Sequence, residues 1–234
     1  MITVRRSEER GHADHGWLDT HHTFSFADYY DPKHMGFRSL RVINDDRVAP
    51  GQGFGTHPHR DMEIVSYVVA GKLAHKDSMG HVEFLGPNEV QKMSAGTGIR
   101  HSEYNGADTE PVHFLQIWIL PRTTGTTPNY EQLSFSPDEK QNRLKLLAAP
   151  ERTPGAVQID QDVHVYATEI SPGASLTHAL LPGRAAWVQI VGGEITLNGQ
   201  HLRTGDGAAI EEETAFELVG AGQRKTELLL FDLA

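Results

Sequence analysis

Short apolar runs, each ended by a turn that contains glycine, proline or asparagine, recur along most of the chain. Between residues 60 and 120 this pattern predicts strands at 63–69, 72–76, 81–84, 90–94 and 114–120. The last of these is almost wholly apolar, as expected of a strand that is buried on both faces. Long amphipathic stretches with helical spacing are hard to find. The pattern therefore predicts an all-β protein.

The second half of the chain repeats this order of strands and turns. WVQIVGGEITLNGQHLRTGDGAAIEE follows the same order as VSYVVAGKLAHKDSMGHVEFLGPNEVQKM, so that Gly193 corresponds to Gly71 and Gly205 to Gly86. The closing TELLLFDL matches FLQIWIL in the same way. Because self-similarity of this kind indicates an internal duplication, we expect two related barrels in tandem.

A polar interval from Pro121 to about Arg143 separates the two halves. It is rich in turn and helix-capping residues and has the composition of a linker. We therefore expect an N-terminal metal-binding barrel at 1–121, a linker at 122–143 and a C-terminal barrel without metal at 144–234. An exchange of edge strands between the C-terminal barrel and the N-terminal segment is left open.

Composition and charge narrow the function classes. The 234 residues can bury a large core, and the absence of cysteine excludes disulfides and thiolate metal sites. The formal net charge of -10, spread along the chain, disfavours nucleic-acid binding. No apolar run approaches the roughly 20 residues of a membrane helix. We expect a soluble cytoplasmic protein, a monomer, with neither nucleic acid nor membrane as a direct partner.

Two pairs of metal-capable side chains carry the chemical signal. His57 and His59 lie in GTHPHRDME, and His101 and Glu103 lie in SAGTGIRHSE. Each pair has one residue between its members, so on a strand both side chains of a pair point to one face. If the two strands adjoin, three imidazoles and a carboxylate converge. Such a donor set suits iron, copper, nickel, cobalt or zinc, and it leaves coordination positions open for a substrate and dioxygen or water.

The other histidines carry a weaker signal. A second group near the N-terminus comprises His12, His15, His21 and His22. This group could form a second metal site, but the aromatic neighbours Trp17, Phe24 and Phe26 favour packing. His178 has the position of a remnant ligand in the second half. Nothing in the sequence marks a role for His75, His81, His113, His164 or His201.

Aromatic and apolar residues near the two pairs allow two interpretations. Phe54, Met93 and Trp118 could line a pocket for a flat substrate, or they could belong to the barrel core. The sequence does not separate these alternatives.

The spacing of these motifs resembles that of the cupins. Gly51-x5-His57-x-His59-x3-Glu63-x7-Gly71 is similar to the first cupin motif with one extra residue, and 86–105 resembles a longer second motif. GWLDTHHTFSF at 16–26, FGTHPHRDME at 54–63 and SAGTGIRHSEYN at 94–105 resemble the pirin family, including bacterial members that act on quercetin. The resemblance implies two cupin (double-stranded β-helix, jelly-roll) barrels, of which the second has lost its metal.

The pirin resemblance also implies a ligand set. One divalent metal ion, most often Fe(II), would be bound by His57, His59, His101 and Glu103, with Cu, Ni, Co, Mn or Zn as alternatives. Glu63, a frequent ligand in other cupins, would lie outside the set, and we expect it to orient a histidine.

The activity that the resemblance implies is a metal-dependent dioxygenase. Such an enzyme takes a small aromatic substrate and dioxygen, opens the central ring of quercetin or a related flavonol, and releases carbon monoxide. Glu103 is then both a ligand and the candidate base for the substrate hydroxyl. Two alternatives stay open. One is a redox-responsive regulatory protein of the pirin type that binds other proteins, and the other is a cupin isomerase or hydrolase that uses its metal as a Lewis acid.

Overall fold

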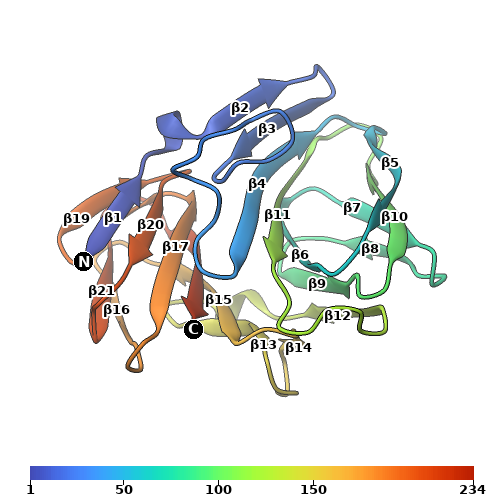
Figure 1. Ribbon diagram of the computed structural model, residues 1–234. Coiled ribbons are helices and arrows are strands. Elements are labelled where there is room, and N and C mark those ends of the chain that lie inside the picture. The colour runs from blue at the N-terminus through green and yellow to red at the C-terminus, as the bar shows by residue number, and fades with distance from the viewer.

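The computed structural model describes residues 1–234 and consists almost wholly of β-strands. Its helices are two single 3-10 turns, Ser7–Glu9 and Pro137–Glu139, and neither has the length or hydropathy of a membrane span. The strands form two seven-stranded and two four-stranded sheets. Figure 1 shows these sheets curled into two barrels that lie side by side, with both chain termini at the second barrel. The prediction of an all-β protein with two tandem barrels is confirmed.

The first barrel combines a large and a small sheet. The large sheet has the order β12-β9-β6-β11-β4-β3-β2. Its strands are β2 (Gly11–Asp14), β3 (Leu18–His22), β4 (Leu40–Val48), β6 (Glu63–Ala70), β9 (Glu89–Ser94), β11 (Val112–Ile119) and β12 (Asn129–Ser134). The small sheet has the order β5-β10-β7-β8. Its strands are β5 (Gly53–His59), β7 (Leu73–Asp77), β8 (Val82–Leu85) and β10 (Ile99–Asn105).

The second barrel repeats this arrangement. Its large sheet has the order β1-β20-β17-β22-β15-β13-β14. These strands are β1 (Ile2–Arg5), β13 (Lys145–Ala149), β14 (Val157–Gln158), β15 (Val163–Ile170), β17 (Ala185–Gly192), β20 (Gly207–Ile210) and β22 (Thr226–Leu233). The small sheet, in the order β16-β21-β18-β19, contains β16 (Ser175–Ala179), β18 (Glu194–Leu197), β19 (Gln200–Arg203) and β21 (Ala215–Gly220).

The duplication is visible strand by strand, since β6 to β11 of the first barrel match β17 to β22 of the second in order and pairing. The paired glycines explain one shared turn. Gly71 and Gly193 follow β6 and β17 with φ of 80° and 90°. A Cβ at Gly71 would lie 2.7 Å from Pro111 O, and one at Gly193 would lie 2.8 Å from Thr226 Cα. Only glycine fits both the backbone conformation and the close approach.

Two segments cross the expected boundaries. β1 pairs with β20, with Ile2 opposite Ile210, so the start of the chain belongs to the second barrel. The interval 122–143, expected to be a linker, includes β12, which pairs with β9 at the edge of the first barrel. An edge strand has only one neighbour and little apolar cover, so its polar sequence, NYEQLS, resembles a linker in composition.

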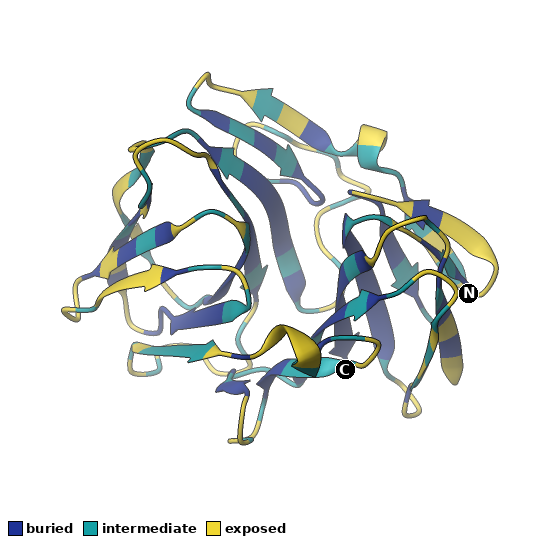
Figure 2. Cartoon of the chain, turned by 180° about the vertical axis from the view of Figure 1, so that it is seen from behind, coloured by how far each residue is buried: buried dark blue, intermediate teal, exposed yellow.

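The two barrels share their largest apolar core. Tyr67, Leu115 and Ile117 of the first barrel belong to the same cluster as Trp187 and Phe231 of the second. Figure 2 shows buried residues concentrated on the long strands and exposed residues in the outer loops. Because this contact is apolar, we expect the barrels to move as one body.

Candidate metal centre

Two adjacent strands of the small sheet bring the predicted histidines together. β5 and β10 are antiparallel, with His57 opposite His101 and His59 opposite Ile99. Ring centroids are 4.5 Å apart for His57 and His101, 4.7 Å for His59 and His101, and 4.8 Å for His57 and His59. The period-two spacing thus places all three imidazoles on one face, as the sequence predicted.

The state of the imidazoles fits a metal ion. Burial, together with neighbouring histidines, lowers the pKa of His101 to about 2 and that of His59 to about 4, so both rings are neutral at neutral pH. Their Nε2 atoms lie 2.9 Å apart, and the buried Nδ1 of His101 has no partner. His57 donates from Nδ1 to Gly55 O at 2.8 Å, which leaves its Nε2 lone pair available. Neutral rings with converging lone pairs suit a divalent cation.

Glu103 supplies a buried carboxyl group beside the histidines. It is 2% exposed, with Ser66 Oγ 3.2 Å from its Oε1, and Gln116 Nε2 donates to its Oε2. Burial raises the pKa of Glu103 to about 7, and the negative charge of Asp46 adds to the rise. A buried carboxylate of this kind is costly to ionise without a positive partner. A metal ion would provide that partner.

The donors form two overlapping groups rather than one compact set of four. His57, His59 and His101 have donor atoms within 4.8 Å of one another, and so do His75, His101 and Glu103. His101 belongs to both groups. Between His101 and Glu103 the pairing of β10 with β5 shifts at a bulge. Such a bulge re-aims side chains along a strand.

Sequence reasoning missed His75. It lies on β7 directly opposite Glu103, is 1% exposed, and its ring centroid is 5.4 Å from that of His101. Its Nε2 lies 3.3 Å from Asp77 Oδ2, and its Nδ1 lies 3.2 Å from Gln91 Nε2. The signal was present, because His75 and Asp77 have the same one-residue spacing as the two predicted ligand pairs.

The contacts of Glu63 differ from the expectation that it orients a histidine. Its Oε2 accepts a hydrogen bond from Ser94 Oγ at 2.9 Å, with Lys92 nearby, and no histidine contacts it. The prediction that Glu63 orients a histidine is therefore wrong. The reason is the face of the strand: Ser66, which contacts Glu103, lies three positions after Glu63 on β6, so the two side chains point to opposite faces of the large sheet.

Aromatic residues near the centre differ in their roles. Trp118 packs edge-on against His59, with ring centroids 5.0 Å apart. Met93 is fully buried beside Ile64 and belongs to the barrel core, and Phe54 packs on Trp17. A depression of about 350 Å³ opens next to His59. It is lined by Pro58, His59, Arg60, Ser78, Gly98, Ile99 and Arg100.

Both halves of the chain match family models. The model described as Pirin matches residues 3–119, and the model described as Quercetinase C-terminal cupin domain matches residues 146–233. The quercetin 2,3-dioxygenase of Escherichia coli K12 is 49% identical over 233 residues, which cover 100% of this chain and 99% of that protein. A pirin-like protein of Caulobacter vibrioides is 38% identical over 235 residues and 100% of both chains.

Solved structures agree with this relationship. The crystal structure of YhhW from Escherichia coli has a TM-score of 0.95 and 48% identity, covering 100% of this chain and 98% of that one. A second structure, of bacterial pirin YhhW in complex with nickel(II), has a TM-score of 0.93 at the same identity, with coverage of 100% and 99%. The Escherichia coli relative that is 49% identical is thus named as an oxidoreductase. A bacterial pirin of this fold has a crystal structure in complex with nickel(II). Both matches extend over the whole chain, and the protein belongs to the pirin family of bicupins.

Proposed function

We propose that this protein is a dioxygenase that opens the central ring of quercetin or a related flavonol and releases carbon monoxide. It would use one metal ion, preferentially iron(II), held by His57, His59, His101 and Glu103. The observation that carries the proposal is the convergence of three imidazoles from β5 and β10 beside a buried carboxyl group. The name of the relative that is 49% identical supports the substrate class.

The metal ion would supply Lewis acidity and redox chemistry for the reaction of an ionised flavonol with dioxygen. The protein would supply position. The hydrogen bond from His57 Nδ1 to Gly55 O fixes the ring of His57. The edge-on packing of Trp118 restricts the ring of His59. In this reaction both atoms of dioxygen enter the product, and one carbon of the central ring leaves as carbon monoxide.

Glu103 is the proposed base for the 3-hydroxyl of the substrate. Its buried position beside the histidines puts a carboxylate at the centre where it can accept that proton. Ser66 and Gln116 hold its two oxygens and keep the group aimed. At the mouth of the centre, Arg60 and Arg100 line the depression beside His59 and would favour a substrate that has become an anion.

The test compares turnover with and without dioxygen. Metal-free protein is loaded separately with iron(II), nickel, cobalt, copper or manganese, and the loss of flavonol absorbance and the release of carbon monoxide are followed. Oxygen-dependent loss with about one carbon monoxide per flavonol supports the dioxygenase. Absence of turnover with every metal overturns it. Oxygen-independent loss would instead favour the isomerase or hydrolase.

Variants separate the role of Glu103 from that of the metal. Glu103→Gln should slow turnover strongly even where metal analysis shows a bound ion, because glutamine cannot accept the proton. Glu89→Gln, at a half-buried position at the start of β9, is a matched control that should turn over normally. A Glu103→Gln protein with bound metal and full rate would remove the base assignment. If no metal supports turnover and a partner protein binds only one oxidation state, the regulatory alternative applies.

A further inference from the structure

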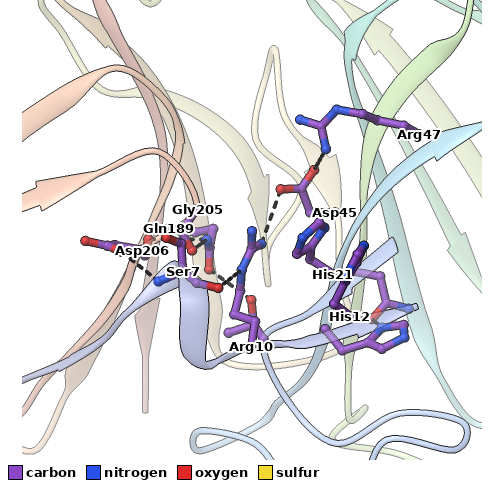
Figure 3. Close-up of polar contacts among 12 residues, drawn as sticks. Ser7, Arg10, His12, His21, Asp45, Arg47, Gln189, Gly205 and Asp206 are labelled. Atoms are coloured by element: carbon purple, nitrogen blue, oxygen red, sulfur yellow. Dashed lines mark hydrogen bonds and ion pairs between the residues drawn. The ribbon is translucent and has the colours of Figure 1, made fainter. Parts of the chain in front are cut away.

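The β2–β3 hairpin carries a second group of metal-capable side chains, at the edge of the large sheet of the first barrel. The donor atoms of His12, Asp19 and His21 all lie within 4.8 Å of one another. They come from strands other than β5 and β10, and none of them belongs to the centre described above. Figure 3 shows His12 and His21 next to each other, with Asp45 and Arg10 near His21.

Strand register brings the three residues together. His12 is directly opposite His21, and Asp19 lies two positions before His21 on the same strand and so faces the same side. The two rings stack, with centroids 4.3 Å apart and planes at 18°. His12 Nε2 is 2.8 Å from Asp19 Oδ1, and His21 Nδ1 is 3.8 Å from the same oxygen. One carboxylate oxygen thus lies between two imidazole nitrogens.

One ring nitrogen of His21 lacks a hydrogen-bond partner. Its Nδ1 is buried at the level of the atom and has no hydrogen-bond partner, because 3.8 Å to Asp19 is too long for a hydrogen bond. A buried polar atom without a partner is costly, and such atoms in folded proteins are usually satisfied by an ion or a water. Burial, and after it the charge of Arg10, lowers the pKa of His21, which favours the neutral ring.

The distances match those of a bound transition metal. Donors that hold zinc at about 2.0–2.1 Å in a tetrahedron lie about 3.3 Å from one another. The distances of Asp19 Oδ1 from His12 Nε2 and His21 Nδ1, 2.8 and 3.8 Å, lie on either side of this value, so small side-chain rotations would suffice. Two imidazoles and one carboxylate are ligands of zinc, nickel and copper(II) rather than of calcium or magnesium.

The surrounding charges do not block a cation. Arg10 is the nearest positive group, and its guanidinium is paired with Asp45 at 3.2 Å. Asp45 lies opposite His21 on β4 and also faces Arg47 at 3.2 Å and His113 at 2.7 Å. The ion pair with Asp45 therefore offsets part of the positive charge of Arg10 (Figure 3).

We propose that His12, Asp19 and His21 form a second metal site, which binds a divalent transition-metal ion of the zinc, nickel or copper(II) class. The exposed side of the site, at His12 and Asp19, leaves the remaining coordination positions to water. The ion ties the edge strand β2 to β3, next to the segment that reaches the second barrel through the contact of Ser7 with Asp206.

The test counts metal ions per chain in full-length protein without an affinity tag. Metal-free protein is titrated with zinc alone, and bound metal is measured after equilibrium dialysis. The wild type should bind two equivalents. His12→Gln and His21→Gln should each bind one equivalent of zinc fewer. The affinity of the second site should fall by more than the roughly 10- to 100-fold that follows when only a residue supporting a ligand is removed. His15→Gln, at the hairpin turn and outside the group, is the matched control and should bind two.

A second measurement keeps the outcome clear if a variant folds poorly. His101→Gln removes a donor of the first centre, so the equivalent that remains in this variant should depend on His12. One equivalent in the wild type at zinc concentrations up to about 100 μM, or two equivalents in His12→Gln, would overturn the proposal. So would equal losses in His12→Gln and His15→Gln. Turnover of quercetin has no part in this test, so it stands independently of the proposed activity.

Discussion

Asp46 offers a sharp test of the electrostatics inside the first barrel. It lies on β4, is 3% exposed, and its Oδ1 has no hydrogen-bond partner. Burial raises the pKa of Asp46 from 3.8 to about 7; the hydroxyl of Thr20 opposes part of this rise, and the charge of Asp45 adds to it. We predict that Asp46→Asn stabilises the metal-free protein at pH 8 and changes its stability by less than about 1 kcal/mol at pH 4.

The sign follows from the order of proton loss. Well below pH 3.8 the group is protonated in both the folded and the unfolded state, and the shift costs nothing. As the pH rises to 7, the unfolded chain loses its proton first, so the free energy of unfolding falls. The difference of about three pKa units corresponds to about 4 kcal/mol at pH 7 and above. Asparagine is neutral and of the same shape, so the variant avoids this loss.

Urea unfolding at several pH values between 4.5 and 8 measures the effect. The stability of the variant minus that of the wild type should grow with pH and level off above pH 7. In thermal melts the gain at pH 8 should be roughly 8–15 °C. Asp108→Asn, at an exposed position, is the control and should give a small, flat difference. A difference for Asp46→Asn that is absent, or that does not change with pH, would refute the reasoning.

Three further predictions concern the centre and the contact between barrels. Gln116→Leu removes the donor to Glu103, and metal affinity in a competition titration should fall about 10- to 100-fold, whereas Gln132→Leu should have no effect. Arg100→Gln should raise the KM for an ionised flavonol and weaken its salt dependence, with kcat unchanged in steady-state assays. Lys140→Met leaves Glu227 without its buried partner, so the free energy of unfolding in urea should fall by roughly 3 kcal/mol. The double variant Lys140→Met/Glu227→Met should regain part of this loss.

Local alternation explains why so much of the first barrel could be predicted from the sequence. The predicted strand at 63–69 is β6, Glu63–Ala70, and the one at 114–120 is β11, Val112–Ile119. In both, the apolar pattern is set by burial on the barrel wall, which is a property of consecutive residues. The same period-two rule put the members of each pair on one face of their strand, and the imidazoles converge because β5 and β10 are neighbours.

Partners far apart in the chain explain what the sequence did not reveal. The pairing of Ile2 with Ile210 joins two short strands whose composition does not indicate their partner. The role of His75 depends on β10 lying between β5 and β7, which places His75 opposite Glu103. Glu63 is a second example, since a motif position indicates proximity in the chain but not the face of the sheet to which a side chain points.

The second barrel shows which changes remove a metal centre from this scaffold. β16 and β21 pair as β5 and β10 do, but His178 lies opposite Phe216, so an apolar ring stands where the first barrel has an imidazole. The Nε2 of His178 is already engaged by Asp232 at 2.9 Å, and Arg184 binds the same carboxylate. Asp232 therefore ties this one remaining histidine to an ion pair with Arg184. The second barrel therefore lacks three of the four donors expected in the first: Leu180, Phe216 and Leu218 stand at the positions that correspond to His59, His101 and Glu103, while the strands and their pairing stay as they are.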